Sequence, residues 1–195
     1  LAPHNGVRVL HEQARVFKTD TGQIHYIEGI TQDITELVDA QQRIRNLAYY
    51  DALTGLANRQ LFRELLLHEL QRAQRQDKQC ALLFIDLDRF KRINDTYGHP
   101  YGDHVLRAVG TILKEVTPAD CLAARIGGEE FAVLVPSSSL SDARALAESV
   151  RLRVAAARVR RQGQDDDATR ITISIGLTLF RHGENGTAFM ERADQ

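Results

Sequence analysis

Two adjacent carboxylates, Glu129 and Glu130, follow a pair of glycines inside a segment that otherwise has the composition of a buried strand. The stretch reads "AARIGGEEFAVLV". Two glycines between apolar runs predict a two-residue hairpin turn in which Gly127 and Gly128 both take positive φ. Taken alone, acids beside such a turn are more often solvated turn residues than reactive groups, so their role depends on what lies next to them.

A second pair of carboxylates supplies a neighbour. Asp86 and Asp88 end the apolar run "CALLFIDLD", which predicts a short buried strand over residues 80–88. If this strand lies beside the hairpin, the carboxylates converge, and such a cluster is unstable unless a divalent cation neutralises it. Ligands that are all oxygen favour Mg²⁺ or Mn²⁺ over zinc, and a Mg²⁺ site with open positions binds phosphates.

The next segment, "DRFKRIND", offers donors for phosphate. Backbone N–H groups of Arg89 and Phe90 and the ammonium group of Lys91 could meet a polyphosphate. A solvated basic turn fits the same residues equally well.

These groups need a scaffold, and from Asp51 onward the pattern alternates helices and strands. The expected order is helix, strand, helix, strand, strand, helix, strand. This order predicts an α/β (α+β) sandwich with a mainly antiparallel central sheet flanked by helices, and not a doubly wound sheet. We expect helices over 58–76, 102–116 and 141–159, strands over 80–88 and 171–180, a hairpin over 123–135, and a polar loop over 160–170.

Residues 1–34 have a different pattern. Apolar and polar residues alternate on both sides of "TDTGQ", which predicts two antiparallel strands around a turn. Two strands are too few to be stable alone, so this segment is interpreted as the C-terminal end of a larger sheet domain.

A linker helix is expected over residues 35–50, because Asp33 followed by Glu36 resembles a helix start. An a/d seam of two heptads favours a parallel dimer through this helix, although a merely amphipathic linker also fits so short a seam. The seam consists of Leu37, Ala40, Ile44 and Leu47.

Composition excludes several classes of partner. The 195 residues carry 25 Lys and Arg against 26 Asp and Glu, a formal charge of -1. No global basic field exists to bind nucleic acid or an anionic membrane. Cys80 and Cys121 lack metal-ligand spacing and lie in or beside apolar runs, as buried free thiols in a reducing, cytoplasmic setting would.

No membrane contact is expected in this segment. The longest apolar run, residues 80–85, is too short to span a bilayer, and no signal-peptide pattern opens the chain. Because the chain starts at Leu1 and its only methionine is Met190, we interpret it as part of a longer protein, which could itself be membrane-anchored.

Four ordered blocks resemble the GGDEF-domain diguanylate cyclases, here in the GGEEF form. The blocks are "DALTGLANR" (51–59), "FIDLDRFKRINDTYGHPYGD" (84–103), "ARIGGEEF" (124–131) and "ITISIG" (171–176). The resemblance runs from residue 51 to residue 195. Residues 1–34 similarly resemble the last strands of a PAS sensor domain, and residues 35–50 the linker that joins the two.

The resemblance implies catalytic and metal-binding roles for the acids. Asp86, the backbone carbonyl of Leu87 and Glu129 would coordinate the first metal. Glu130 would serve a second metal position or help to accept the proton of the attacking hydroxyl.

Asn94 and Asp103 match the family positions that read guanine. A carboxylate accepts from guanine N1–H and N2–H, and an amide can meet O6, N3 or N2, so the pair would discriminate against adenine. In isolation Asn94 would be interpreted as a turn residue and Asp103 as a helix cap.

The implied reaction condenses two GTP molecules into cyclic di-GMP and pyrophosphate. It would be metal-dependent, would take place at a homodimer interface where two sites face each other, and would be regulated by the upstream PAS sensor. One alternative is a catalytically silent GTP-binding regulatory domain of a larger signalling protein, with a phosphodiesterase domain downstream. Another is an interaction domain without nucleotide chemistry.

Two departures from the family pattern stand out. Pro118 and Cys121 occupy the positions of an inhibitory product-binding R-x-x-D, so feedback inhibition through that site is expected to be absent. The family also continues beyond residue 195 into a helix with basic residues that contact phosphates. We therefore expect the GGDEF domain over 51–195 to lack its last helix and some phosphate affinity.

Overall fold

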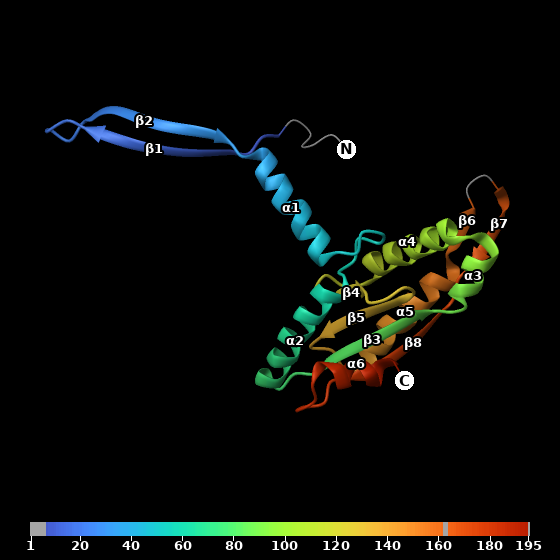
Figure 1. Cartoon of the computed structure of the whole chain (residues 1–195). Helices are drawn as coiled ribbons and strands as arrows, with labels where there is room; N and C mark the ends of the chain where they lie inside the picture. The colour runs from blue at the N-terminus through green and yellow to red at the C-terminus, as the bar shows by residue number, and fades with distance from the viewer. Residues whose placement is uncertain (1–6, 162–163, 195) are drawn as a thin grey trace. The chain divides into compact units, whose positions relative to one another are not determined.

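The computed structural model describes residues 7–161 and 164–194, and the chain divides into two units, Leu1–Ala48 and Tyr49–Gln195 (Figure 1). In the first unit, β1 (Leu10–Lys18) and β2 (Ile24–Asp33) form an antiparallel ribbon. The turn between them is closed by a bond from the N–H of Gly22 to the carbonyl of Thr19, 2.8 Å long. The predicted pair of strands is confirmed.

Both faces of this ribbon are exposed. Six of its large apolar side chains are between 49% and 74% exposed, whereas Phe17 is half-buried; the six are Leu10, Val16, Ile24, Tyr26, Ile27 and Ile30. A two-stranded ribbon without a buried face is marginally stable at best in water. This exposure agrees with a fragment of a larger sheet, whose identity as a PAS domain stays a prediction.

Helix α1 (Thr35–Tyr49) begins where the sequence predicted. The Asp33 carboxylate accepts a 3.0 Å bond from the N–H of Thr35, which satisfies a donor at the start of the helix. None of the residues of α1 is buried, and Leu37, Ile44 and Leu47 are 56%, 67% and 74% exposed. The apolar seam is therefore left exposed by the described residues of its own unit.

The second unit is built on a four-stranded sheet in the order β4-β5-β3-β8, antiparallel throughout. Its members are β3 (Cys80–Leu87), β4 (Leu122–Arg125), β5 (Glu130–Pro136) and β8 (Ile173–Leu179). β3 lies in the interior of the sheet, which explains why its sequence is continuously apolar and does not alternate. The predicted fold class is confirmed.

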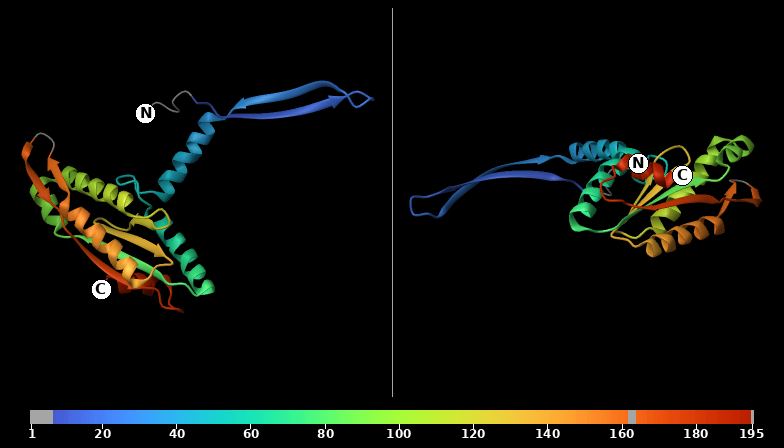
Figure 2. Two further views of the ribbon diagram at one scale, coloured as in Figure 1. Left: turned by 180° about the vertical axis from the view of Figure 1, so that it is seen from behind. Right: turned by 90° about the horizontal axis from the view of Figure 1, so that it is seen from below.

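Helices cover both faces of this sheet (Figures 1 and 2). On one face, α2 (Arg59–Gln76) and α6 (Gly186–Asp194) pack against Leu82 and Phe84 of β3. On the other face, α4 (His99–Val116) and α5 (Leu140–Ala156) pack against Leu83, Ile85 and Leu87. Alternate residues of β3 thus enter two separate cores.

Helix α3 (Phe90–Tyr97) was missed, and α4 starts earlier than expected. The sequence suggested only a basic turn over α3, and a start at residue 102 for α4. Gly98 ends α3 with a φ of +84°, a value that glycine adopts without strain, and Pro100 lies in the first turn of α4. This glycine and proline therefore separate two helices.

The polar loop predicted over 160–170 is partly wrong. β6 (Arg158–Arg161) pairs antiparallel with β7 (Gln164–Arg170), and α5 ends at Ala156, before the predicted residue 159. Residues 162 and 163 of that loop lie outside the described residues. The ribbon is anchored by Val159, which is 4% exposed and whose carbonyl accepts a 2.8 Å bond from the hydroxyl of Tyr101.

The two cysteines are free thiols, with Cys80 buried and Cys121 half-buried. Burial raises the pKa of Cys80 to about 12 and that of Cys121 to about 11. Both are therefore protonated at neutral pH and poor nucleophiles. Among the described residues, none of the helices combines the length and the apolar character that a bilayer span requires.

Gly176 lets α6 approach the sheet. It lies opposite Phe84 in the β3–β8 pair, and a Cβ atom there would collide with the main-chain carbonyl of Ala193. We expect Gly176→Ala to lower the free energy of unfolding by about 1–3 kcal/mol, because the helix must shift. Urea denaturation measures this change.

Gly128→Ala is the matched control, because a Cβ atom at Gly128 meets no atom within 4 Å. The control should change the free energy of unfolding by less than about 0.5 kcal/mol. Equal losses in both variants would contradict the contact between Gly176 and α6.

Candidate active site

The turn between β4 and β5 is longer than predicted. Residues 126–129 separate the two strands, and the N–H groups of Ile126 and Gly127 both donate to the carbonyl of Glu130, at 2.9 and 3.3 Å. Neither glycine has a positive φ, so the predicted two-residue turn was wrong. A Cβ atom at residue 127 would overlap the Glu130 carboxylate, so any other residue there would require the Glu130 side chain to move.

The strand register brings the two acidic segments together. Asp86 lies directly opposite Glu130 in the β3–β5 pair, and the N–H of Leu87 donates to the carbonyl of Glu129 at 3.3 Å. The end of β3 is thereby bound to the loop that carries both glutamates. The predicted adjacency of these strands is observed, whereas the chemical roles of the acids stay predictions.

The carboxylates near the end of β3 make ionisation of their neighbours less favourable. Burial, followed by repulsion from Asp88 and Asp194, raises the pKa of Asp86. Burial, followed by repulsion from Asp86 and Glu130, raises the pKa of Glu129. A bound cation would remove this repulsion.

Carboxylate oxygens of this kind suit Mg²⁺ or Mn²⁺. In residues 7–161 and 164–194, however, no three His, Cys, Asp or Glu side chains are close enough to form a complete metal site. Main-chain or substrate oxygens would have to contribute, which agrees with the expected role of the Leu87 carbonyl. Asp88 is otherwise engaged, because its carboxylate accepts a 2.6 Å bond from the Ser174 hydroxyl.

The start of α3 presents backbone donors. The N–H groups of Arg89, Phe90 and Lys91 lie where the helix begins, and such N–H groups have no acceptor within the helix itself. Such N–H groups favour anions. The side chain of Phe90 is only 6% exposed and belongs to the core, so Phe90 can offer a ligand only its backbone, whereas the side chains of Arg89 and Lys91 are exposed.

Asn94 and Asp103 lie on neighbouring helices. Asn94 is in α3 and Asp103 is inside α4, so neither is a turn residue or a helix cap. The Asn94 amide lies against Gly102, where a Cβ atom would overlap its oxygen. Glycine before Asp103 therefore makes room for Asn94, and both side chains are half-buried.

Residues 48–195 match the family described as "Diguanylate cyclase, GGDEF domain". The chain belongs to the GGDEF family. It is 40% identical to diguanylate cyclase DgcP of Pseudomonas aeruginosa over 170 residues, 87% of this chain and 25% of DgcP. It is 37% identical to cyclic di-GMP phosphodiesterase PdeR of Escherichia coli over 164 residues, 83% of this chain and 24% of PdeR. The chain thus spans about a quarter of the length of these relatives.

The fold of this GGDEF protein is similar to a solved structure from Caulobacter crescentus. That structure is the coiled coil and GGDEF domain of DgcB in complex with c-di-GMP, with a TM-score of 0.78 and 34% sequence identity. The match covers 83% of this chain and 84% of the DgcB chain. This chain and DgcB therefore share an α/β core with an antiparallel sheet.

An open hollow beside Asp86 adds residues that sequence reasoning missed. It lies between α3 and the junction of β7 with β8, and neither Asn94 nor Asp103 lines it. The structure therefore does not gather all predicted site residues into one cavity. The polar lining consists of Asp86, Asp88, Arg89, Arg92, Thr96, Tyr97, Thr169, Arg170 and Thr172.

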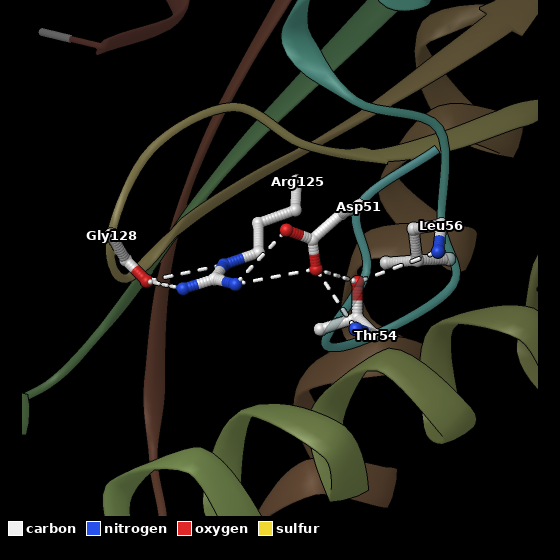
Figure 3. A network of polar contacts seen from close by, with 5 residues as sticks. All are labelled: Asp51, Thr54, Leu56, Arg125 and Gly128. Atoms are coloured by element: carbon white, nitrogen blue, oxygen red, sulfur yellow. Dashed lines mark hydrogen bonds and ion pairs between the residues drawn. The ribbon is translucent and has the colours of Figure 1, made fainter. Parts of the chain in front are cut away.

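Sequence reasoning also missed a polar network behind the GGEEF loop of this GGDEF domain (Figure 3). Arg125 bonds to the Asp51 carboxylate and to the Gly128 carbonyl. Partial burial opposes ionisation of Asp51, but the hydrogen bonds from Thr54 and the charge of Arg125 outweigh it and lower its pKa. The only signal in the sequence was that both partners belong to the blocks quoted above.

Proposed function

We propose that this chain is a diguanylate cyclase module, which condenses two GTP molecules into cyclic di-GMP and releases pyrophosphate. The observation that carries the proposal is the register of β3 and β5, which places Asp86 beside Glu129 and Glu130 at one strand end. Membership of the GGDEF family and the 40% identity to DgcP support it.

Asp86, the Leu87 carbonyl and Glu129 would hold a Mg²⁺ or Mn²⁺ ion. When bound, such an ion polarises the α-phosphoryl group and lowers the pKa of the attacking 3′-hydroxyl. Glu130, directly opposite Asp86, serves a second metal position or accepts the proton of that hydroxyl. The raised pKa of Asp86 and of Glu129 is the feature of this chain that supports a cation there.

The same unit offers groups for the rest of the nucleotide. Asn94 and Asp103 read the guanine from the α3–α4 pair, next to Gly102. The N–H groups of residues 89–91, at the start of α3, and the side chains of Arg89 and Lys91 bind the phosphates, since a helix start attracts anions. The nucleotide would thereby be held at the start of α3 and by the α3–α4 pair.

Joining two nucleotides requires two sites, because each site holds one GTP. We therefore propose a homodimer in which the sites of two copies face each other. The exposed seam of α1 suits contact with a second copy, and a PAS sensor ending in the β1–β2 ribbon would regulate that contact from the cytoplasm. The seam residues are Leu37, Ala40, Ile44 and Leu47.

Incubation with GTP and Mg²⁺, followed by chromatography and mass spectrometry, tests the proposal. Cyclic di-GMP and pyrophosphate in a one-to-two ratio are expected. The similarity to PdeR, whose name denotes a phosphodiesterase, makes a silent GTP-binding regulator the alternative. GTP binding without any turnover would favour that alternative over the cyclase.

Product inhibition provides a separate prediction. Pro118 is exposed and uncharged, and the half-buried Cys121 has its thiol 3.7 Å from an Asp120 oxygen. A dinucleotide anion needs a cation to meet its phosphates, and these residues supply none. Initial rates should therefore show only competitive inhibition by cyclic di-GMP across a range of GTP concentrations.

The double substitution Pro118→Arg with Cys121→Asp is the companion variant. It should introduce noncompetitive inhibition by cyclic di-GMP, because the guanidinium group of the new arginine can bind the phosphates of the product. Noncompetitive inhibition of the wild type that this variant does not strengthen would place an inhibitory site elsewhere.

A further inference from the structure

Arg125 is the last residue of β4, and three of its nitrogen atoms bond to two partners, one of them 74 positions away in the sequence. Its Nη1 donates to both oxygens of Asp51, at 3.2 and 3.1 Å. Its Nε and Nη2 donate to the carbonyl of Gly128, at 3.3 and 2.8 Å. The side chains of Arg125 and Asp51 are only 16% and 22% exposed, so water screens this pair less than a surface pair.

The Asp51 end of this network is itself anchored. The Asp51 carboxylate accepts from the N–H and the hydroxyl of Thr54, at 2.8 and 2.7 Å, and its carbonyl accepts from the N–H of Gly55 at 2.7 Å. Lys114 of α4 donates to the carbonyl of Thr54 at 3.0 Å. The turn at 51–55 is therefore a rigid support, and it follows the last residue of α1 by two positions.

The Gly128 end has few other restraints. Gly128 is exposed, and no atom lies within 4 Å of the place where its Cβ atom would be. Glycine has more backbone freedom than any other residue, so an untethered loop with two glycines would sample many conformations. The next residue is Glu129, so movement of Gly128 would move the backbone that carries the Glu129 carboxylate.

We propose that Arg125 is a positioning residue. By holding the Gly128 carbonyl and the Asp51 carboxylate at once, it fixes the loop that carries Glu129 relative to the segment directly after α1. Displacement of residues 51–55 then displaces Glu129, which gives a linker helix a direct path to the metal-binding loop. The kinetic consequences rest on the proposed cyclase function, whereas the positioning itself does not.

Hydrogen–deuterium exchange tests the positioning without any turnover. The amides of Ile126 and Gly127 bond to Glu130, and that of Leu87 bonds to Glu129, so their exchange reports the geometry of the loop. Arg125→Ala should accelerate exchange at these amides by about tenfold. Asp51→Asn should accelerate it at the same amides although the substitution lies outside the loop.

Arg153→Ala is the matched control, because Arg153 forms a 3.1 Å pair with Glu115 while both side chains are more than half exposed. The control should leave exchange in residues 126–130 unchanged. Arg125→Lys keeps the positive charge but loses the planar guanidinium group that bonds to two partners at once, so loop exchange should be intermediate between the wild type and Arg125→Ala. This variant replaces Arg125→Ala if the latter fails to fold. Unchanged loop exchange in both Arg125 variants would overturn the proposal.

Kinetics separate positioning from general destabilisation. In Arg125→Ala, the Mg²⁺ concentration for half-maximal rate should rise about tenfold and kcat should fall by a factor of about ten to a hundred, since a misplaced group loses rate steeply. The ratio of GTP to ATP affinity should stay unchanged, because Asn94 and Asp103 are not touched. A parallel loss of guanine selectivity would indicate a merely structural role and contradict the proposal.

If the wild-type protein makes no cyclic di-GMP, the proposed function is refuted. The exchange experiment still tests the role of Arg125, because it does not depend on turnover. Faster loop exchange in the Arg125 variants would then still establish Arg125 as the positioning residue. Product formation by the wild type together with unaltered loop exchange would refute only the role of Arg125.

Discussion

Asp86→Asn should abolish cyclic di-GMP formation while the domain stays folded. The substitution keeps the shape of the side chain but removes a charge that a divalent cation needs. Because Asp86 is half-buried at the end of β3 and outside the apolar core, no packing is lost. Product analysis after incubation with GTP and Mg²⁺ should show a loss of at least about a thousandfold, the scale expected when metal-assisted stabilisation of several kcal/mol is removed.

The melting temperature of Asp86→Asn should respond to pH with a definite sign. The pKa of Asp86 is raised in the folded state, so its stabilising contribution is present at acid pH and is lost as the pH rises through the folded pKa. In the absence of metal, the variant should therefore melt at a higher temperature than the wild type at pH 8. The difference should disappear at a pH where Asp86 is protonated.

Asp20→Asn is the control for the turnover measurement, since Asp20 is an exposed carboxylate in the β1–β2 turn. It should retain turnover. Turnover at the wild-type rate in Asp86→Asn would refute the metal assignment. A lower melting temperature at pH 8 would show that Asp86 is not strained by its neighbours.

Asp103→Ala should weaken GTP binding about ten- to a hundredfold and leave ATP binding almost unchanged. Loss of hydrogen bonds between a carboxylate and guanine N1–H and N2–H corresponds to about 1.5–3 kcal/mol. Adenine presents no such pair of donors on this edge, so its affinity has little to lose. Isothermal titration with each nucleotide in the presence of Mg²⁺ measures both affinities.

Asp95→Ala supplies the comparison, because Asp95 is an exposed carboxylate in α3 next to Asn94. It should affect GTP and ATP equally and weakly. An equal loss for both nucleotides in Asp103→Ala would mean that Asp103 does not read the base.

The sheet could be predicted because its sequence pattern reflects burial directly. β3 is buried on both faces and therefore reads as a continuous apolar run, and the pairing of β4 with β5 was indicated by apolar segments on both sides of two glycines. That β3 lies beside β5, so that Asp86 is opposite Glu130, was only a condition in the sequence analysis and is supplied by the structure. Local patterns were sufficient for the strands but not for their pairing.

Other elements left weaker signals. Helix α3 is only eight residues long, and its N-cap residue, Arg89, has a φ of +59° and provides no side-chain cap, so the sequence carries no start signal. The ribbon β6–β7 is held together by backbone pairing through a polar segment that lacks strand alternation. The hydrogen-bonded ion pair between Arg125 and Asp51 joins residues that are 74 positions apart, and no short window of sequence reveals such a pair.

The interior position of β3 makes folding depend on contacts between distant parts of the chain. β3 pairs with β5 through Asp86 and Glu130 and with β8 through Asp86 and Ser174, so dozens of residues must be looped out before either pairing forms. Loop-closure entropy slows such pairings, whereas the β4–β5 hairpin closes locally. The hairpin can therefore form early in folding, but its glutamates face Asp86 only after β3 has docked. Any chemistry that needs Asp86 and the glutamates side by side would then be absent from a partly folded chain.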